Sequence, residues 1–467
     1  MMLTDCSKRW LFIIVLSCGL AWPGFYNGFC LFMGDSATYI ESWLEHSVMA
    51  VRPSFYPFFI GILINWRTIH LVILFQIIFI AIILEILLTR CLELAVSIAL
   101  LIAITTTVAW WANMLMSDIF FGIAGLGFFV LAFYNGKLSV LERYSTITIL
   151  LLSLLMHMVI PVLIFAVAIL YLIVDFIMRK PLNRMMLALT ILALFSWSCF
   201  PLLNRVYGNS YTPSTGLYKF IAARMAGDGL ISPQDMEYFA RNAPERIVKL
   251  KEQMETIQRT VTPNYQRIQV VLFDPISPFL DWEQDQRVVS FKEIVKTTLR
   301  KKPLQNMSTV LAGASRLWTY PEIPTYIVEA MGPQLGLFLE KPFPEYFQRF
   351  LKTRQANGLL KLSFWNSIIS FCYYFSLIIL VLGTAVSVFL SFRWRKRPAH
   401  KADNLLRFAR FILIFLVLHS IIIYFLAGDF PRYQSRMSWL VGLAAPGLVI
   451  ALYDRYQQSS RGELQPD

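Results

Sequence analysis

The stretch TIHLVILFQIIFIAIILEILL, residues 68–88, decides the fold class of this chain. Its only charged residue is Glu85, and as an α-helix it is long enough to cross a hydrocarbon core about 30 Å thick. Similar runs recur along the 467 residues, of which 57% are hydrophobic and 15% charged, whereas soluble domains carry about 25% charged residues. This composition excludes an ordinary soluble enzyme and a disordered chain, and it predicts an all-α membrane protein.

The apolar runs predict about ten transmembrane helices. They cover about 10–32, 68–88, 94–112, 119–135, 146–160, 162–178, 185–203, 364–391, 408–427 and 436–453. Residues 33–66 are too interrupted by charges and prolines to cross, so we expect an outer loop with interfacial helices. Residues 205–363 have helical spacing but no run long enough to cross. The expected organisation is a transmembrane module (1–204), a mostly helical extracytoplasmic domain (205–363) and a C-terminal transmembrane module with a cytoplasmic tail (364–467).

The basic residues give the expected orientation. The formal charge is +13, from 42 Lys and Arg against 29 Asp and Glu. Seventeen basic residues fall on one side of the predicted spans, four in the short segments on the other, and 21 in the long segment. Because Lys and Arg gather in cytoplasmic loops, we expect both termini in the cytoplasm and the large domain in the periplasm, in an inner (plasma) membrane protein. The positive charge then reflects orientation, and no nucleic-acid partner is expected.

Isolated polar residues gather at the predicted outer ends of the spans. A charge at the bilayer centre costs about 2.5–3.5 kcal/mol on insertion scales, so such residues are candidates for function. They come from distant parts of the chain, namely Asp35, Arg52, Asp118, His157, Asp429, Arg432 and Tyr433. In this topology they share one surface, which the large domain could cover.

Each of these residues also has a structural interpretation. Asp35 could cap a helix and Asp118 could favour a helix dipole. His157 could form a hydrogen-bonded turn, and the arginines could be interfacial anchors or snorkel to the interface. Thr38 with Glu41 fits a capping box, which would leave Asp35 unnecessary for capping.

The glycine-rich stretch GIAGLG, residues 122–127, resembles the glycine pattern of a nucleotide-binding loop. It lies inside an apolar run with no preceding strand. The sequence therefore predicts close helix packing at Gly122, Gly125 and Gly127 rather than nucleotide binding.

Three elements of the first 180 residues carry a family resemblance: Gly34-Asp35-Ser36-Ala37-Thr38-Tyr39, Arg52-Pro53-Ser54-Phe55-Tyr56-Pro57 and Met116-Ser117-Asp118. With paired spans and a late outer domain, they resemble the GT-C superfamily of integral-membrane glycosyltransferases. The nearest likeness is to glycosyltransferase family 39, the protein mannosyltransferase and aminoarabinose transferase group. The resemblance implies a polyprenyl-phosphate-linked sugar donor and a catalytic base in the first loop. By this likeness Asp35 is the base, Asp118 is the second-loop acid, and Arg52 and Tyr56 belong to a substrate-binding element.

The implied reaction suits these residue types. A carboxylate at Asp35 could take the acceptor's hydroxyl proton, which would give inversion at the anomeric carbon. The leaving phosphate gains charge, so Arg432, with Tyr433 beside it and Arg52 second, is expected to stabilise it. His157 could hold the phosphate or the acceptor. The acceptor would be a glycan, lipid or protein of the cell envelope, and membrane lipids would surround the site.

A divalent cation is compatible with the two acids. Asp35 and Asp118 could hold Mg²⁺ or Mn²⁺ if they approach within about 5 Å across a shared ion. No spacing in the sequence requires a metal or any other cofactor.

Three alternatives to the transferase stay open. A transporter or flippase for lipid-linked saccharide would place charges in the middle of spans. A polysaccharide polymerase or ligase would depend more on Arg432 and His157 than on Asp35. A non-catalytic envelope assembly protein would use the outer domain to bind a partner.

Overall fold

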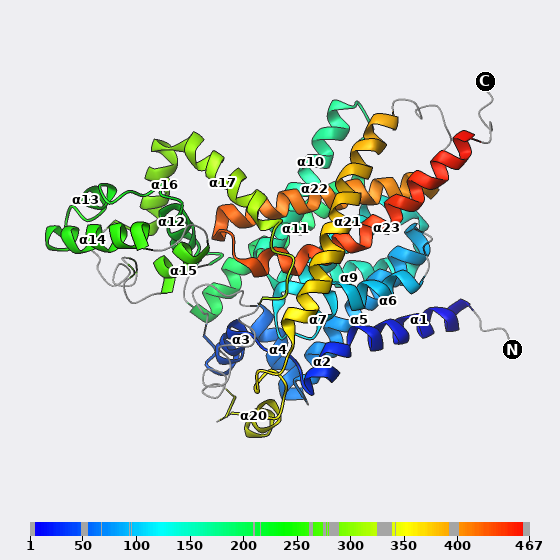
Figure 1. The fold of residues 1–467 in the computed structure, drawn as a ribbon, viewed down its shortest axis with the longest axis horizontal. Coiled ribbons are helices and arrows are strands. Elements are labelled where there is room, and N and C mark those ends of the chain that lie inside the picture. The colour runs from blue at the N-terminus through cyan, green and yellow to red at the C-terminus, as the bar shows by residue number, and fades with distance from the viewer. Residues whose placement is uncertain are drawn as a thin grey trace. The chain divides into compact units, whose positions relative to one another are not determined.

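The computed structural model describes residues 5–47, 55–66, 68–92, 94, 96–208, 211–214, 216–260, 265–273, 277, 279, 289–324, 339–340, 342–391 and 401–460. Within these ranges the chain is helical and contains no strand, only one isolated bridge between Leu31 and Met114. The predicted all-α class is confirmed for the described part of the chain (Figure 1).

The chain forms two compact units. Unit 1 contains Met1–Tyr211, Pro321–Leu416 and Ser435–Asp467, and unit 2 contains Thr212–Tyr320 and Val417–Gln434. The helices α22 (Lys401–Ala427) and α23 (Pro431–Ser460) contribute residues to both units.

The other helices of unit 1 come mostly from the first 210 residues. They are α1 (Asp5–Leu20), α2 (Trp22–Asn27), α3 (Gly34–Leu44), α4 (Phe55–Trp66), α5 (His70–Ile86), α6 (Val96–Thr105), α7 (Val108–Ala112), α8 (Phe120–Tyr134), α9 (Val140–Met156), α10 (Val159–Ile177), α11 (Arg184–Gly208), α20 (Pro344–Leu351) and α21 (Leu362–Ser391). A π-helical turn over Leu87–Leu92 extends α5, and a 3₁₀ turn over Ser117–Ile119 leads into α8.

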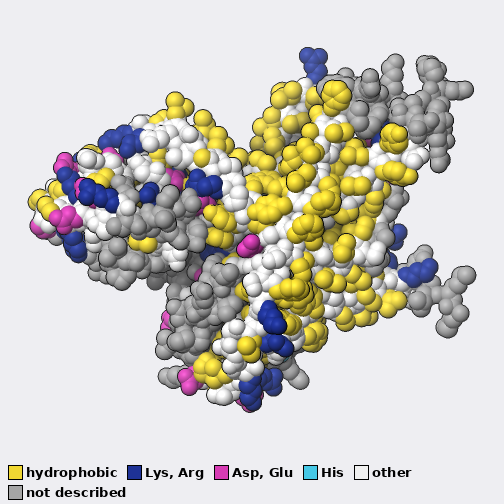
Figure 2. Space-filling model, in the orientation of Figure 1, with side chains coloured by type: hydrophobic (Ala, Val, Ile, Leu, Met, Phe, Trp, Pro, Cys, Tyr) yellow, Lys and Arg dark blue, Asp and Glu magenta, His cyan; other side chains and the backbone are white. Residues whose placement is uncertain are grey.

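Eight helices in the described ranges are long and apolar enough to cross a membrane. They are Ser7–Asn27, His70–Leu92, Ser117–Lys137, Val159–Ile177, Arg184–Val206, Leu362–Phe389, Ala402–Ala427 and Pro431–Gln457. Hydrophobic side chains cover much of the visible face of the unit 1 helices (Figure 2), and Phe176, Phe371 and Phe389 are each more than 70% exposed. A soluble protein would bury such residues, whereas lipid solvates them, so the chain is a multi-pass membrane protein.

Two of the ten predicted spans do not form long apolar helices. The third, 94–112, is divided into α6 and α7 at Thr106 and Thr107. The fifth, 146–160, corresponds to α9, which has 17 residues and ends at Met156. The count of ten therefore stays a prediction.

Unit 2 has an apolar core of its own. Its described helices are α12 (Leu217–Gly227), α13 (Asp235–Phe239), α14 (Pro244–Thr260), α15 (Tyr265–Phe273), α16 (Phe291–Lys301) and α17 (Pro303–Leu317). Helix α12 packs against α15 and α16, and its Met225 lies in one buried cluster with Met254, Ile268 and Ile294. The surface around α13 and α14 carries interspersed basic and acidic side chains (Figure 2), as expected for a part in contact with water.

The segment between unit 2 and α21 belongs to unit 1, although the sequence placed it in the domain 205–363. Gln355 is buried, and its side-chain amide forms two hydrogen bonds with the backbone of Phe32. Its Nε2 donates to the Phe32 carbonyl at 2.7 Å, and its Oε1 accepts from the Phe32 N–H at 3.1 Å. The backbone N–H of Gln355 also donates to Asn27 Oδ1 at 2.8 Å. These bonds attach residues near 355 to the loop that precedes α3.

Candidate functional site

The loop before α3 is paired with the segment after α7. The Leu31 N–H donates to the Asn113 carbonyl at 2.9 Å, and the Leu115 N–H donates to the Leu31 carbonyl at 3.1 Å. Asn113 is itself fixed, because its Nδ2 donates to the carbonyl of Leu20 at the end of α1. The start of α3 is therefore held beside the polypeptide that leads into α8.

Asp35 lies half-buried in the first turn of α3, where the helix dipole favours a negative charge. The next residue, Ser36, donates its hydroxyl to the Leu115 carbonyl at 2.9 Å. One turn later the Tyr39 hydroxyl lies 3.1 Å from Ser117 Oγ. Two side chains of α3 thus attach the Asp35 turn to the segment that ends at the second acid of the predicted site.

The capping box expected from Thr38 and Glu41 is wrong. Helix α3 begins at Gly34, with Met33 as its N-cap residue, so Thr38 lies inside the helix. The Thr38 hydroxyl donates to the carbonyl of Asp35 at 2.8 Å instead. The sequence placed the helix start too late.

Asp118 forms a buried ion pair with Arg436 of α23. The Asp118 Oδ1 and Arg436 Nη1 atoms are 2.6 Å apart, and the two side chains are 5% and 0% exposed. The Arg436 guanidinium also lies 3.6 Å from the ring centroid of Phe121, in the first turn of α8. Asp118 therefore already has a cationic partner. Arg436 was not singled out as a site residue from the sequence.

His157 lies at the end of α9, in the turn before α10. Its Nδ1 accepts a hydrogen bond from the Val159 N–H at 3.2 Å, so the hydrogen-bonded turn proposed for it is present. Its ring packs edge-on against Phe121, with 4.8 Å between ring centroids. Phe121 thus contacts both His157 and Arg436, and it brings the ends of α8, α9 and α23 together.

Tyr56 is fully buried and lies beside Tyr39 of α3. Its hydroxyl donates to Gln76 Oε1 at 2.8 Å, and its ring lies 4.9 Å from that of Tyr39. Gln76 in turn donates to the carbonyls of Ala112 and Met114. The Tyr56 hydroxyl thus supports the loop between α7 and α8, and its predicted role in substrate binding stays a prediction.

The remaining predicted residues lie elsewhere. Arg52 is outside the described residues. Arg432 and Tyr433 belong to unit 2, where the Arg432 guanidinium lies 5.2 Å from the Tyr433 ring centroid. Their assignment to the donor phosphate stays a prediction.

Asp429 closes a hydrogen-bonded network inside unit 2. Arg316 Nε donates to Asp429 Oδ2 at 2.9 Å, and Arg316 Nη2 donates to the Tyr424 hydroxyl at 3.0 Å. The Tyr424 hydroxyl donates to Asp228 Oδ1 at 2.6 Å, and Arg224 Nη1 lies 3.3 Å from Asp228 Oδ2. Burial raises the pKa of Asp429 above its usual value, although Arg316 opposes the shift. The network fixes the loop after α22.

A second charged cluster lies at the opposite end of α9. Arg9 of α1 pairs with Glu85 of α5 and Glu142 of α9, both at 2.7 Å, and Arg90 pairs with Glu142 at 2.9 Å. One end of each of the three helices α1, α5 and α9 therefore meets here, at residues that the sequence placed on the cytoplasmic side. His157 marks the other end of α9.

A metal site does not emerge from the described side chains. Among them, no group of three or more His, Cys, Asp and Glu could hold a metal ion. Asp118 is paired with Arg436, and the proposal that Asp35 and Asp118 share a cation stays a prediction.

No protein-family model matches the chain, and neither a curated protein nor a solved structure matches it.

Proposed function

We propose that the chain is an inverting membrane glycosyltransferase. It moves a sugar from a polyprenyl-phosphate carrier to a cell-envelope acceptor at the outer face of the plasma membrane. The observation that carries this proposal is the attachment of the Asp35 turn to the segment before α8, through Ser36 and Tyr39. An acid, an imidazole and a buried ion pair lie at ends of apolar helices, which supports a substrate whose headgroup lies at the membrane surface.

The structure favours different roles for the two acids. Asp118 is bound to Arg436 and almost fully buried, so it orients the arginine and the end of α23. Asp35 is half-buried at a helix start and is the better placed carboxylate to take a proton from an acceptor hydroxyl. The donor phosphate is assigned from the sequence to Arg432.

The decisive test is the Asp35→Asn variant in washed membranes supplied with a lipid-linked sugar. We expect transfer to fall by about 10²–10⁴-fold, because the amide cannot accept the proton, while expression is unchanged. Glu41→Gln is the matched control, since Glu41 lies two turns further along α3 and is also half-buried. It should retain activity. Full transfer by Asp35→Asn would exclude Asp35 as the base.

The same assay separates the alternatives. A polymerase or ligase would lose activity in Arg432→Ala and His157→Ala but not in Asp35→Asn. A flippase would move the lipid-linked saccharide across vesicles without forming a glycosidic bond. A non-catalytic assembly protein would show none of these effects.

We also propose ten crossings, with both termini in the cytoplasm and unit 2 in the periplasm. Helix α9 has 17 residues, or about 26 Å, close to the thickness of the hydrocarbon core. It runs from the charged cluster at Glu142 to His157, which supports a full crossing. The pair α6 and α7 would make the tenth.

A further inference from the structure

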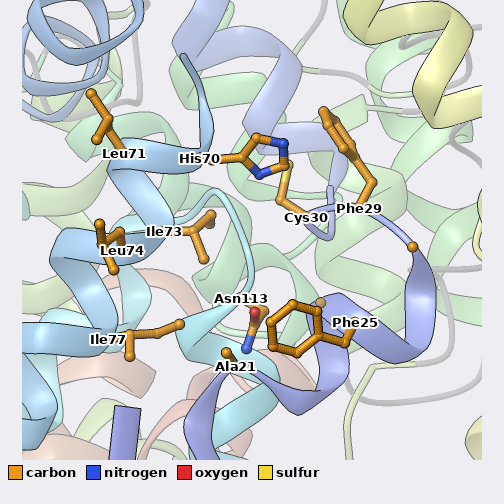
Figure 3. A pocket seen from close by; sticks show the side chains of 12 residues that line it. Ala21, Phe25, Phe29, Cys30, His70, Leu71, Ile73, Leu74, Ile77 and Asn113 are labelled. Atoms are coloured by element: carbon orange, nitrogen blue, oxygen red, sulfur yellow. The ribbon is translucent and has the colours of Figure 1, made fainter. Parts of the chain in front are cut away.

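A cavity of about 460 Å³ in unit 1 is not used by the proposed reaction. It lies between α2, the first half of α5 and the residue that follows α7. In Figure 3, Leu74 and Ile77 of α5 lie on the left, and Phe25 and Asn113 lie to their right. His70 and Phe29 lie above them. The lining is apolar apart from His70, Asn113 and the thiol of Cys30, which suits a hydrocarbon ligand.

The lining residues show where the cavity opens. Phe25 is 79% exposed and Leu74 is 46% exposed, and both belong to helices that cross the membrane. Exposed apolar side chains on such helices face lipid. The cavity is therefore open to the chains of the bilayer rather than to bulk water.

One end of the cavity is polar. His70 is the first residue of α5, is exposed, and packs edge-on against Phe29 at 4.9 Å. Phe29 also contacts Tyr346 of α20 at 6.2 Å. Arg349 is exposed on the same helix α20, three residues after Tyr346 and therefore on the same helical face. An imidazole in the lining, with an exposed arginine on the helix that contacts Phe29, matches a phosphate that is joined to a hydrocarbon chain.

We propose that this cavity binds one acyl chain of an anionic phospholipid, whose phosphate contacts Arg349 and His70. The volume is about three times the ~150 Å³ of an apolar cavity that holds one benzene ring, so it has room for about eighteen carbons. That is one acyl chain, whereas a polyprenyl chain is several times longer. The bound lipid fills the space between α2 and α5. This inference requires only that the chain spans a membrane and does not depend on transferase activity.

The test is photo-crosslinking of the full chain in nanodiscs that contain a phosphatidylglycerol with a photoreactive acyl chain. We expect crosslinks in the segments 21–30 and 70–77. Leu74→Trp fills the cavity and should lower labelling by about tenfold. The matched control is Leu101→Trp, on a 57% exposed position of α6 that does not line the cavity, and it should label as the wild type does.

The headgroup is tested in the same format. Arg349→Ala should remove the preference for phosphatidylglycerol over phosphatidylcholine while leaving total labelling similar. Crosslinks confined to other helices would overturn the proposal, as would displacement of the phospholipid by stoichiometric polyprenyl phosphate. Because the wild-type crosslink map is itself decisive, the test holds even if one variant fails to fold.

Discussion

Phe121 is the residue on which the described part of the site converges. Its ring contacts the Arg436 guanidinium at 3.6 Å and the His157 ring at 4.8 Å. A desolvated cation–π contact contributes up to about 2 kcal/mol. The chain has 37 phenylalanines, and nothing local distinguishes this one. Its role depends on three helices meeting, which the sequence does not specify locally.

The buried pair of Asp118 and Arg436 makes a stability prediction. Arg436→Ala leaves a carboxylate buried without a partner, so we expect a loss of about 3–5 kcal/mol in the free energy of unfolding. Asp118→Asn combined with Arg436→Ala removes both charges and should be destabilised by less than the sum of the two single substitutions. Chemical unfolding in detergent measures the cycle. Additive effects of the two substitutions would contradict a direct coupling.

Residue spacing could predict only part of this site. Polar residues between two apolar runs can be located from the sequence. This holds for Asp35, Asp118 and His157, whose positions near the ends of the spans were predicted. Arg432 and Arg436 are one helical turn apart, and spacing alone cannot tell which one reaches an acid. The partner of Asp118 was therefore missed.

At the scale of elements, glycines of α8 allow close helix packing. A Cβ on Gly122 would lie 2.4 Å from the Trp439 ring of α23, and one on Gly125 would lie 2.7 Å from the Phe415 ring of α22. The predicted close helix packing is confirmed at Gly122 and Gly125.

A methyl group at Gly125 tests this packing. Gly125→Ala forces the Phe415 ring to shift, and we expect a loss of about 1–3 kcal/mol in stability. Gly136→Ala is the control, since nothing lies within 4 Å of its added Cβ. Thermal unfolding followed by size-exclusion chromatography gives both midpoints. Equal midpoints for the two variants would show that the interface is loose.

The division of α6 from α7 was not predictable from local sequence. The break falls at Thr106 and Thr107, and threonine does not by itself end a helix. The Thr107 hydroxyl donates to the Ser435 carbonyl at 2.7 Å and lies 2.9 Å from Ser438 Oγ. The interruption is thus stabilised by α23, more than 300 residues away, and hydropathy alone reads 94–112 as one continuous run.

At the scale of the whole molecule, the membrane class and the existence of a polar unit were readable from composition and long runs. The residues at which that unit begins and ends could not be predicted in the same way. The segment near Gln355 has the polarity of a soluble domain, yet it belongs to unit 1 because Gln355 hydrogen-bonds Phe32 and Asn27. Polarity predicts contact with water and does not say which unit a segment joins.

The proposed orientation predicts opposite labelling of two surface positions. We expect Glu237→Cys, on a 61% exposed side chain of unit 2, to react with a membrane-impermeant maleimide in intact cells. Lys180→Cys, on a 59% exposed side chain after α10, should react only in broken cells. Both are made with the native cysteines replaced by alanine. The reverse pattern would invert the topology.

The ion pair between the turn that leads into α8 and helix α23 also has a consequence for biosynthesis. Asp118 and Arg436 are separated by 318 positions, so the acid leaves the ribosome long before the arginine exists. At about 5–20 residues per second, that interval is about 16–64 s. During it, α8 must enter the bilayer with an unneutralised carboxyl group at its end, at a cost of up to about 2.5–3.5 kcal/mol. A nascent chain truncated before α23 would keep the Asp118 carboxyl group unneutralised. The last helix therefore completes the assembly of the helices that are synthesised first.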